Sequence, residues 1–229
     1  RFNGHAEPLQ RVYDGKEKEW VVIPRNKEQS FAMDLLLDEQ IPIVTLIGRA
    51  GSGKTLCAIS AGLQQVLDER TYKRLIVSRP VQPMGRDIGY LPGTMEEKMR
   101  PWLAPIRDNL QFLMGGDKFM MEEYMTNGTV EIEAITYIRG RSISDAYMII
   151  DEAQNLSRHE LKTIITRVGD NTKIILTGDI EQIDNAYVDE TSNGLTYAIE
   201  KFKDAEISGH ITLKRGERSK VATLAADIL

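Results

Sequence analysis

The chain has 229 residues, of which 41% are hydrophobic and 28% charged, a composition typical of globular proteins and unlike that of disordered or collagen-like chains. Its one cysteine, Cys57, allows neither an internal disulfide nor a thiolate metal cluster, which indicates a reducing, cytoplasmic setting. A net charge of −5 argues against general attraction to nucleic acid but leaves room for a local basic surface. No apolar run approaches the roughly 18 residues of a membrane span, so we expect no membrane partner.

The first 25 residues differ from the rest of the chain. They are mostly polar and charged, with a short apolar run at 21–23, and they begin at Arg1 without an initiator methionine. We interpret residues 1–25 as a linker or edge segment of a longer protein. Residues 26–229 have the size of one domain with its own hydrophobic core.

Within this domain, short apolar segments alternate with amphipathic ones. We expect strands at 41–47, 75–77, 130–135, 147–150, 173–176 and 207–213, and helices at 26–37, 55–67, 94–113, 157–168, 195–202 and 220–229. Asn26 and Ser157 are candidate N-caps. Pro101 and Pro105 should break or restart the helix that contains them. This alternation predicts an α/β fold with a parallel sheet covered on both faces.

A phosphate-binding loop is the strongest chemical signal. The run Gly48-Arg49-Ala50-Gly51-Ser52-Gly53-Lys54-Thr55 matches G-x-x-x-x-G-K-[ST] between a predicted strand and a predicted helix. Backbone amides of such a loop and the helix N-terminus attract phosphate oxygens. Lys54 can reach the β- and γ-phosphates of ATP, and the Thr55 hydroxyl can bind Mg²⁺. The alternative is a glycine-rich turn that binds nothing.

Two adjacent acids follow the apolar segment at 147–150. Asp151 lies where ligands of open α/β sheets bind and would hold Mg²⁺ through water, while Glu152 could polarise an attacking water. This pair suits an ATPase better than a small-molecule kinase, which has to exclude water. The alternative is an acidic helix N-terminus without a chemical role.

A third polar group ends the segment at 173–176. Thr177, Gly178 and Asp179 should lie near Asp151 at the same edge of the sheet, with Gln182 three residues further on. The polar side chains of this group, those of Thr177, Asp179 and Gln182, could sense the γ-phosphate. The alternative is a plain turn that Asp179 caps.

Further motifs make the chain resemble the PhoH-like family of ATPases, relatives of superfamily 1 helicases. The resemblance runs from about Asn26 to Leu229. Besides the phosphate loop, it rests on residues 78–83, on Gly85 with 88–93 and 96–98, on 136–141 and on 151–155. It implies a three-layer RecA-like P-loop NTPase domain with a mainly parallel central sheet, hydrolysing ATP with Mg²⁺.

The resemblance also implies roles for single residues. Gln29 looks like the helicase residue that reads adenine, although it could equally serve a helix-capping box. Gln182 looks like a γ-phosphate sensor. Arg218 looks like an arginine finger, with Arg215 as a competitor and a solvated arginine as the alternative.

The family's links to RNA metabolism suggest single-stranded RNA as a partner. The proline- and glycine-rich segment 79–93, with Arg139 and Arg141, would then face RNA or a neighbouring subunit. Some family members assemble as rings, and one branch carries an upstream PIN nuclease domain, which the missing start of this chain would fit. The 50 residues after Asp179 are too few for a second RecA-like domain, so a neighbouring copy would donate the arginine finger, in a ring with a hexamer as one candidate size.

Three functions fit these signals. The leading hypothesis is a motor domain that couples ATP hydrolysis to RNA binding or unwinding within a larger RNA-processing protein. The second is an ATP-binding switch that controls assembly or an attached effector domain. The third is a small-molecule kinase.

Overall fold

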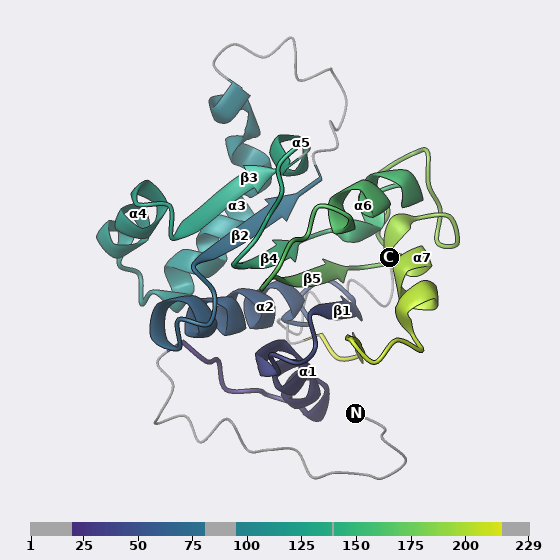
Figure 1. Ribbon diagram of the computed structural model, residues 1–229, viewed down its shortest axis with the longest axis horizontal. Helices are drawn as coiled ribbons and strands as arrows, with labels where there is room; N and C mark the ends of the chain where they lie inside the picture. Colours follow the sequence, from purple (N-terminus) through teal and green to yellow (C-terminus); the bar gives the residue numbers. More distant parts are fainter. Residues whose placement is uncertain (1–19, 81–94, 139, 217–229) are drawn as a thin grey trace.

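The computed structural model describes residues 20–80, 95–138 and 140–216. These residues form a central sheet between two layers of helices (Figure 1). The predicted three-layer α/β architecture with a mainly parallel sheet is therefore confirmed, and every strand pairing among the described residues is parallel.

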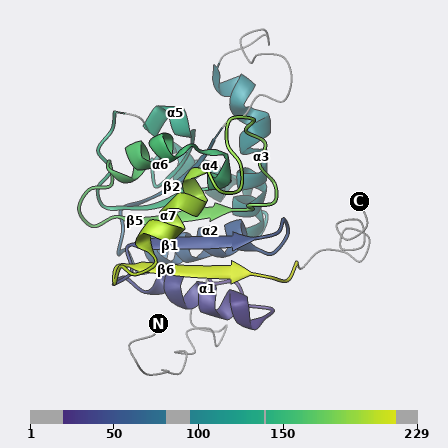
Figure 2. The ribbon, with the colours of Figure 1, turned by 90° about the vertical axis from the view of Figure 1, so that its right-hand side faces the viewer.

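The sheet places the chemically important loops at one edge. Its strands are β1 (Ile43–Gly48), β2 (Arg74–Arg79), β3 (Val130–Ala134), β4 (Ala146–Ile150), β5 (Lys173–Gly178) and β6 (Ser208–Leu213). They lie in the order β3-β2-β4-β5-β1-β6, with β6 at one edge of the sheet (Figure 2). Because all run in the same direction, the segments that follow β1, β2, β4 and β5 meet at the carboxyl end of the sheet.

The helices divide between the two faces of the sheet. One layer holds α1 (Lys27–Leu37), α2 (Lys54–Leu63) with its π-helical extension η1 (Gln64–Asp68), α3 (Met95–Leu113) and α4 (Lys118–Thr126). The other holds α5 (Ile135–Ile138), the 3₁₀ turn η3 (Ala153–Asn155), α6 (Arg158–Ile165) and α7 (Gly194–Phe202). The sequence did not suggest α4 or α5.

Alternating side chains of each central strand fill the two cores. In β4, Tyr147 and Ile149 pack towards α2, while Met148 and Ile150 pack towards α6 and α7. All four are fully buried. Burial on both faces explains why β4 reads as a continuous apolar run.

Both predicted helix caps are confirmed. The Asn26 side chain accepts a hydrogen bond from the backbone N–H of Gln29 (2.9 Å). Ser157 and Glu160 form a reciprocal capping box at the start of α6. These caps fix the two helices on either side of the site.

The prediction that Pro101 and Pro105 interrupt their helix is wrong, because α3 continues through both. The prolines are four residues apart, so they share one face of the helix, and both are exposed. The carbonyls that they leave without a partner can therefore be hydrated. On the opposite side, Ile106 and Leu110 are fully buried, and this packing offsets the cost of about 3 kcal/mol per proline.

The N-terminal segment 20–22 lies against α2 and is not a strand. The Ser60 hydroxyl donates to the Trp20 carbonyl (2.6 Å) and accepts from the N–H of Val22 (2.9 Å), and the Gln64 side chain accepts from the N–H of Trp20 (3.4 Å). The helix expected at 220–229 and most of the proline- and glycine-rich segment lie outside the described residues. Among the helices that are described, none has the length and apolar character to cross a membrane.

Candidate nucleotide site

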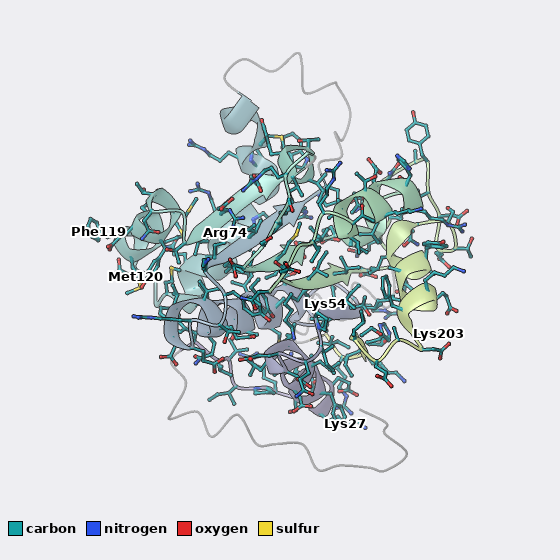
Figure 3. All side chains as sticks on the ribbon, in the orientation of Figure 1. Lys27, Lys54, Arg74, Phe119, Met120 and Lys203 are labelled. Carbon is teal, nitrogen blue, oxygen red and sulfur yellow. The ribbon has the colours of Figure 1, made fainter. Side chains whose placement is uncertain are left out.

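The predicted phosphate loop joins β1 to α2 and curls around its own lysine. Lys54 begins α2 and lies near the centre of the view in Figure 3, with 8% of its surface exposed. Its ammonium group donates hydrogen bonds to the carbonyls of Gly48 and Arg49, the latter at 3.1 Å. The Ser52 hydroxyl is buried beside it without a hydrogen-bond partner. The loop therefore holds a cation and an unpartnered hydroxyl, a setting that fits a phosphate group.

Gly53 is required by the geometry of this loop. Its φ of +88° is a left-handed conformation that few other residues adopt. A Cβ atom at this position would also lie 2.9 Å from the Gln29 side-chain nitrogen. The remaining predicted loop residues, Gly48, Ala50 and Gly51, lie in the same turn between β1 and α2.

The two residues predicted to bind metal lie in direct contact. The Thr55 hydroxyl donates a hydrogen bond to Asp151 Oδ1 at 2.7 Å, although the two residues are 96 positions apart in the sequence. Thr177 at the end of β5 donates to the same oxygen at 2.6 Å. Hydroxyl and carboxylate oxygens are the ligands that Mg²⁺ prefers, so this group of residues fits the ion.

Glu152 follows Asp151 in a strained backbone conformation. Its φ of +55° and ψ of +40° are left-handed, which turns the chain sharply after β4. Burial raises the pKa of its carboxyl group, and the negative charge of Asp151 adds to this effect. A hydrogen bond from Gln154 and the positive charges of Arg79 and Lys54 act in the opposite direction.

Gln154 links this acid to the loop after β5, a role that the sequence did not reveal. The fully buried side chain donates to Glu152 Oε2 (2.6 Å) and to the Gln182 carbonyl (2.8 Å), and its oxygen accepts from the N–H of Asp179 (3.2 Å). The available signal was its place in the family motif at 151–155, four residues after the end of β4.

Asp179 connects the loop after β5 to the phosphate loop. Its Oδ2 accepts a hydrogen bond from the N–H of Ala50 (3.0 Å), and its Oδ1 accepts from the N–H of Glu181 (3.1 Å). Turn capping and contact with the nucleotide site are thus combined in one side chain. Gln182, the predicted phosphate sensor, is exposed beside it.

Gln29 also contacts the phosphate loop. Its side-chain nitrogen donates to the Ser52 carbonyl (3.0 Å), and its oxygen accepts from the N–H of Arg25 (2.8 Å). The side chain therefore reaches back beyond the N-cap, much as in a capping box, while holding the loop that would bind phosphate. A role in reading adenine stays a prediction.

The arginines that the sequence singled out have different surroundings in the structure. Arg79 pairs with Glu152 at 3.4 Å. Arg141, expected to face RNA or a neighbouring subunit, is bound to Glu133 (2.9 Å) and Glu131 (3.1 Å), the acidic side chains of β3. Arg215 is exposed, and Arg139 and Arg218 lie outside the described residues.

A second polar cluster supports the turn after β4. Asn155 Oδ1 accepts hydrogen bonds from the N–H groups of Asp184 (2.7 Å) and Asn185 (3.2 Å), and the Asn185 side chain donates to the Asn155 carbonyl (2.9 Å). Both asparagines are buried. The segments after β4 and β5 are therefore joined at two places, by the hydrogen bonds of Gln154 and by those of Asn155.

The sequence matches a known family over most of its length. Residues 21–228 match the family model described as PhoH-like protein. Protein PhoH2 of Bacillus subtilis is 54% identical over 223 residues, 96% of this chain and 50% of the relative. Protein PhoH2 of Mycolicibacterium smegmatis is 42% identical over 206 residues, 90% of this chain and 46% of the relative. The chain thus spans about half the length of these curated relatives.

Solved structures show a weaker likeness. The SWI2/SNF2 ATPase core of Sulfolobus solfataricus, solved in complex with dsDNA, has a TM-score of 0.47 and 13% identity, covering 84% of this chain and 45% of the other. An overlap of this size carries no argument about activity.

Proposed function

Because the chain belongs to the PhoH-like protein family, we propose that it is a Mg²⁺-dependent ATPase that couples hydrolysis to RNA binding or unwinding, with single-stranded RNA as its partner. It would act as the motor domain of a larger RNA-processing protein. The observation that carries this proposal is the contact of Thr55 and Thr177 with one oxygen of Asp151, which joins the phosphate loop to the acid-bearing strand.

Each residue of the site has a role in this proposal. The amides of the phosphate loop and Lys54 hold the phosphates, and Thr55 and Asp151 hold Mg²⁺, which would neutralise charge on the β- and γ-phosphate oxygens. Glu152 orients and deprotonates the attacking water. Gln182 responds to the γ-phosphate, and Gln29 contacts the base.

The test is the steady-state rate of phosphate release with and without Mg²⁺ and single-stranded RNA. We expect little turnover with a chelator present, and a rate that rises with RNA at low salt, since backbone contacts with nucleic acid are salt-sensitive. Glu152→Gln should bind ATP but lose nearly all turnover, whereas Glu123→Gln, an exposed control on α4, should behave as the wild type. A rate that RNA leaves unchanged at low salt would refute the motor.

One observation favours the alternative of an ATP-binding switch. Both oxygens of Glu152 are already in contact with other side chains, Oε1 with Arg79 and Oε2 with Gln154. A base held in this way predicts slow turnover. If the protein is a switch, Glu152→Gln should change its slow rate very little while ATP still alters its assembly.

We further propose that neighbouring copies complete the site in a ring. The phosphate loop lies at the carboxyl end of the sheet, and Arg218, or the exposed Arg215, would be donated there in trans as an arginine finger. An upstream PIN domain and a cytoplasmic location complete this proposal for the full-length protein. Light scattering with and without ATP and RNA tests the ring, and a monomer under all conditions would exclude it.

A further inference from the structure

The ion pair between Arg79 and Glu152 holds one oxygen of the proposed base on the side of β2. The order of neighbouring strands is β2-β4-β5-β1, so Glu152 after β4 lies between Arg79 on the β2 side and the phosphate loop on the β1 side. Ser78 is directly opposite Ile150 in the sheet, which brings Arg79 beside the turn that carries Glu152. This contact on the β2 side restrains the carboxylate from moving towards the phosphate loop.

The other oxygen of the carboxylate is held as well. Gln154 donates to Glu152 Oε2 at 2.6 Å and is itself fixed by the backbone of Asp179 and Gln182. With both oxygens engaged, the Glu152 side chain can turn towards a nucleotide only when one contact is released. The Gln154 side chain is fully buried and its contact with Glu152 is 2.6 Å long, so the 3.4 Å contact with Arg79 is the weaker of the two.

Arg79 is accessible to a ligand. Its side chain is 22% exposed, and its separation from Glu152 is 3.4 Å, longer than an ideal charge-assisted hydrogen bond. Ion pairs between partly exposed side chains contribute little stability. A guanidinium group matches the geometry of a phosphate, so a phosphodiester can compete with Glu152 for Arg79.

We propose that Arg79 is a positioning residue that restrains Glu152 until a phosphate of single-stranded RNA binds its guanidinium group. RNA binding at the end of β2 then frees the base one strand away, and ATP hydrolysis begins. This inference rests on the proposed RNA-stimulated ATPase and specifies how the stimulation reaches the site.

The experiment compares Arg79→Ala and Arg79→Lys with a matched control, Arg74→Ala. Arg74 lies at the opposite end of the same strand, where it pairs with Glu131 at 2.9 Å (Figure 3). ATP turnover is measured with and without oligo(U) of about 20 nucleotides, a length that exceeds typical single-strand sites. RNA affinity without nucleotide is measured by fluorescence anisotropy.

We expect Arg79→Ala to raise turnover without RNA about fivefold, the effect of releasing one weak ion pair. Its ratio of stimulated to unstimulated turnover should fall towards one, and its affinity for oligo(U) should decrease. Arg79→Lys keeps a cation beside Glu152 but loses the forked guanidinium group, so its unstimulated rate should rise less than that of Arg79→Ala. Arg74→Ala should match the wild type in both rates.

Several outcomes would overturn the inference. If Arg79→Ala loses stimulation while its unstimulated rate stays unchanged, Arg79 binds RNA without restraining Glu152. If the unstimulated rate falls, Arg79 supports the active position of the base instead. If stimulation survives intact, RNA does not act through this residue. A wild-type protein that RNA fails to stimulate refutes the proposed function itself, and this result is distinct from the other three.

Affinity for a fluorescent ATP analogue shows whether each variant retains a folded site. If Arg79→Ala loses this affinity, Arg79→Gln replaces it, because its amide keeps a polar group at the position without the charge. The expected rise in unstimulated turnover is the same. If folded Arg79→Gln shows no rise in unstimulated turnover, Arg79 does not restrain Glu152.

Discussion

Raising the pH from about 7 to about 8.5 should stabilise the fold, because Lys173 is fully buried at the start of β5. Its ammonium group donates hydrogen bonds to the carbonyls of Leu35 (2.9 Å) and Asp38 (2.7 Å) at the end of α1. Burial lowers the pKa of Lys173 from 10.5 to about 7, against the opposing effect of the carboxylates of Asp38 and Glu39.

The sign and size of the effect follow from this pKa. Between about pH 7 and pH 10.5 the unfolded chain holds a proton that the folded chain has released, so the free energy of unfolding rises with pH. One pKa unit corresponds to about 1.4 kcal/mol, which gives a gain of at most about 2 kcal/mol by pH 8.5.

Other buried groups limit the useful pH range. Burial raises the pKa of Cys57 from 9.0 to about 12 and that of Tyr72 from 10.0 to about 12, so both remove stability above about pH 9. His210 is exposed, and partial desolvation of its ring lowers its pKa from 6.5, so its contribution changes only in more acidic solution. Lys173 therefore dominates between these limits.

The assay is urea unfolding at several pH values for the wild type, Lys173→Met and the exposed control Lys118→Met. In Lys173→Met the free energy of unfolding should no longer rise between about pH 7 and pH 8.5. It should also be lower by about 1–3 kcal/mol for each of the two carbonyls left without a donor. Lys118→Met should keep the wild-type slope. If the free energy of unfolding rises equally with pH in the wild type and in Lys173→Met, Lys173 does not cause the pH dependence.

Three further changes test the nucleotide site. Lys54→Ala should weaken ATP binding about a hundredfold by removing charge-assisted hydrogen bonds, measured by fluorescence titration; unchanged affinity would contradict the phosphate-loop assignment. Thr177→Val should lower the affinity for Mg²⁺–ATP several-fold, since Asp151 loses a hydroxyl partner at 2.6 Å; titration of Mg²⁺ at fixed ATP checks this, and an unchanged curve counts against the metal site. Gly178→Ala would place a Cβ 2.5 Å from Gln154 Oε1, so turnover should fall about tenfold or more with ATP affinity retained, and normal kinetics would contradict the link through Gln154.

Much of the fold could be predicted because local patterns decided it. The buried strand β4 is a continuous apolar run, β5 has three consecutive apolar residues at its centre, and Ser157 with Glu160 marks the start of α6 at the expected residue. The continuity of α3 could not be predicted, because it depends on which side of the helix its prolines occupy. That side is fixed by packing against β2 and β3, which local sequence does not reveal.

The site shows the same division. The phosphate loop is contiguous in sequence, so its pattern indicated its chemistry, and parallel strand order brought Asp151 and Thr177 to it. The contacts of Gln154 with Glu152 and of Asp179 with Ala50 were not predictable, because each depends on the exact path of a turn. The left-handed backbone of Glu152 sets the path of the turn after β4, and an acidic dipeptide does not predict that conformation.

The attachment of residues 20–22 to α2 has a practical and a mechanical consequence. A shortened chain that starts at residue 26 would strip the buried Ser60 hydroxyl and Gln64 oxygen of their main-chain partners, and should fold less stably than one that keeps Trp20. In addition, any pull on the chain at Trp20 is applied to the helix whose first residue is Lys54. These contacts therefore couple the backbone of residues 20–22 mechanically to the phosphate loop, which joins the first residue of α2.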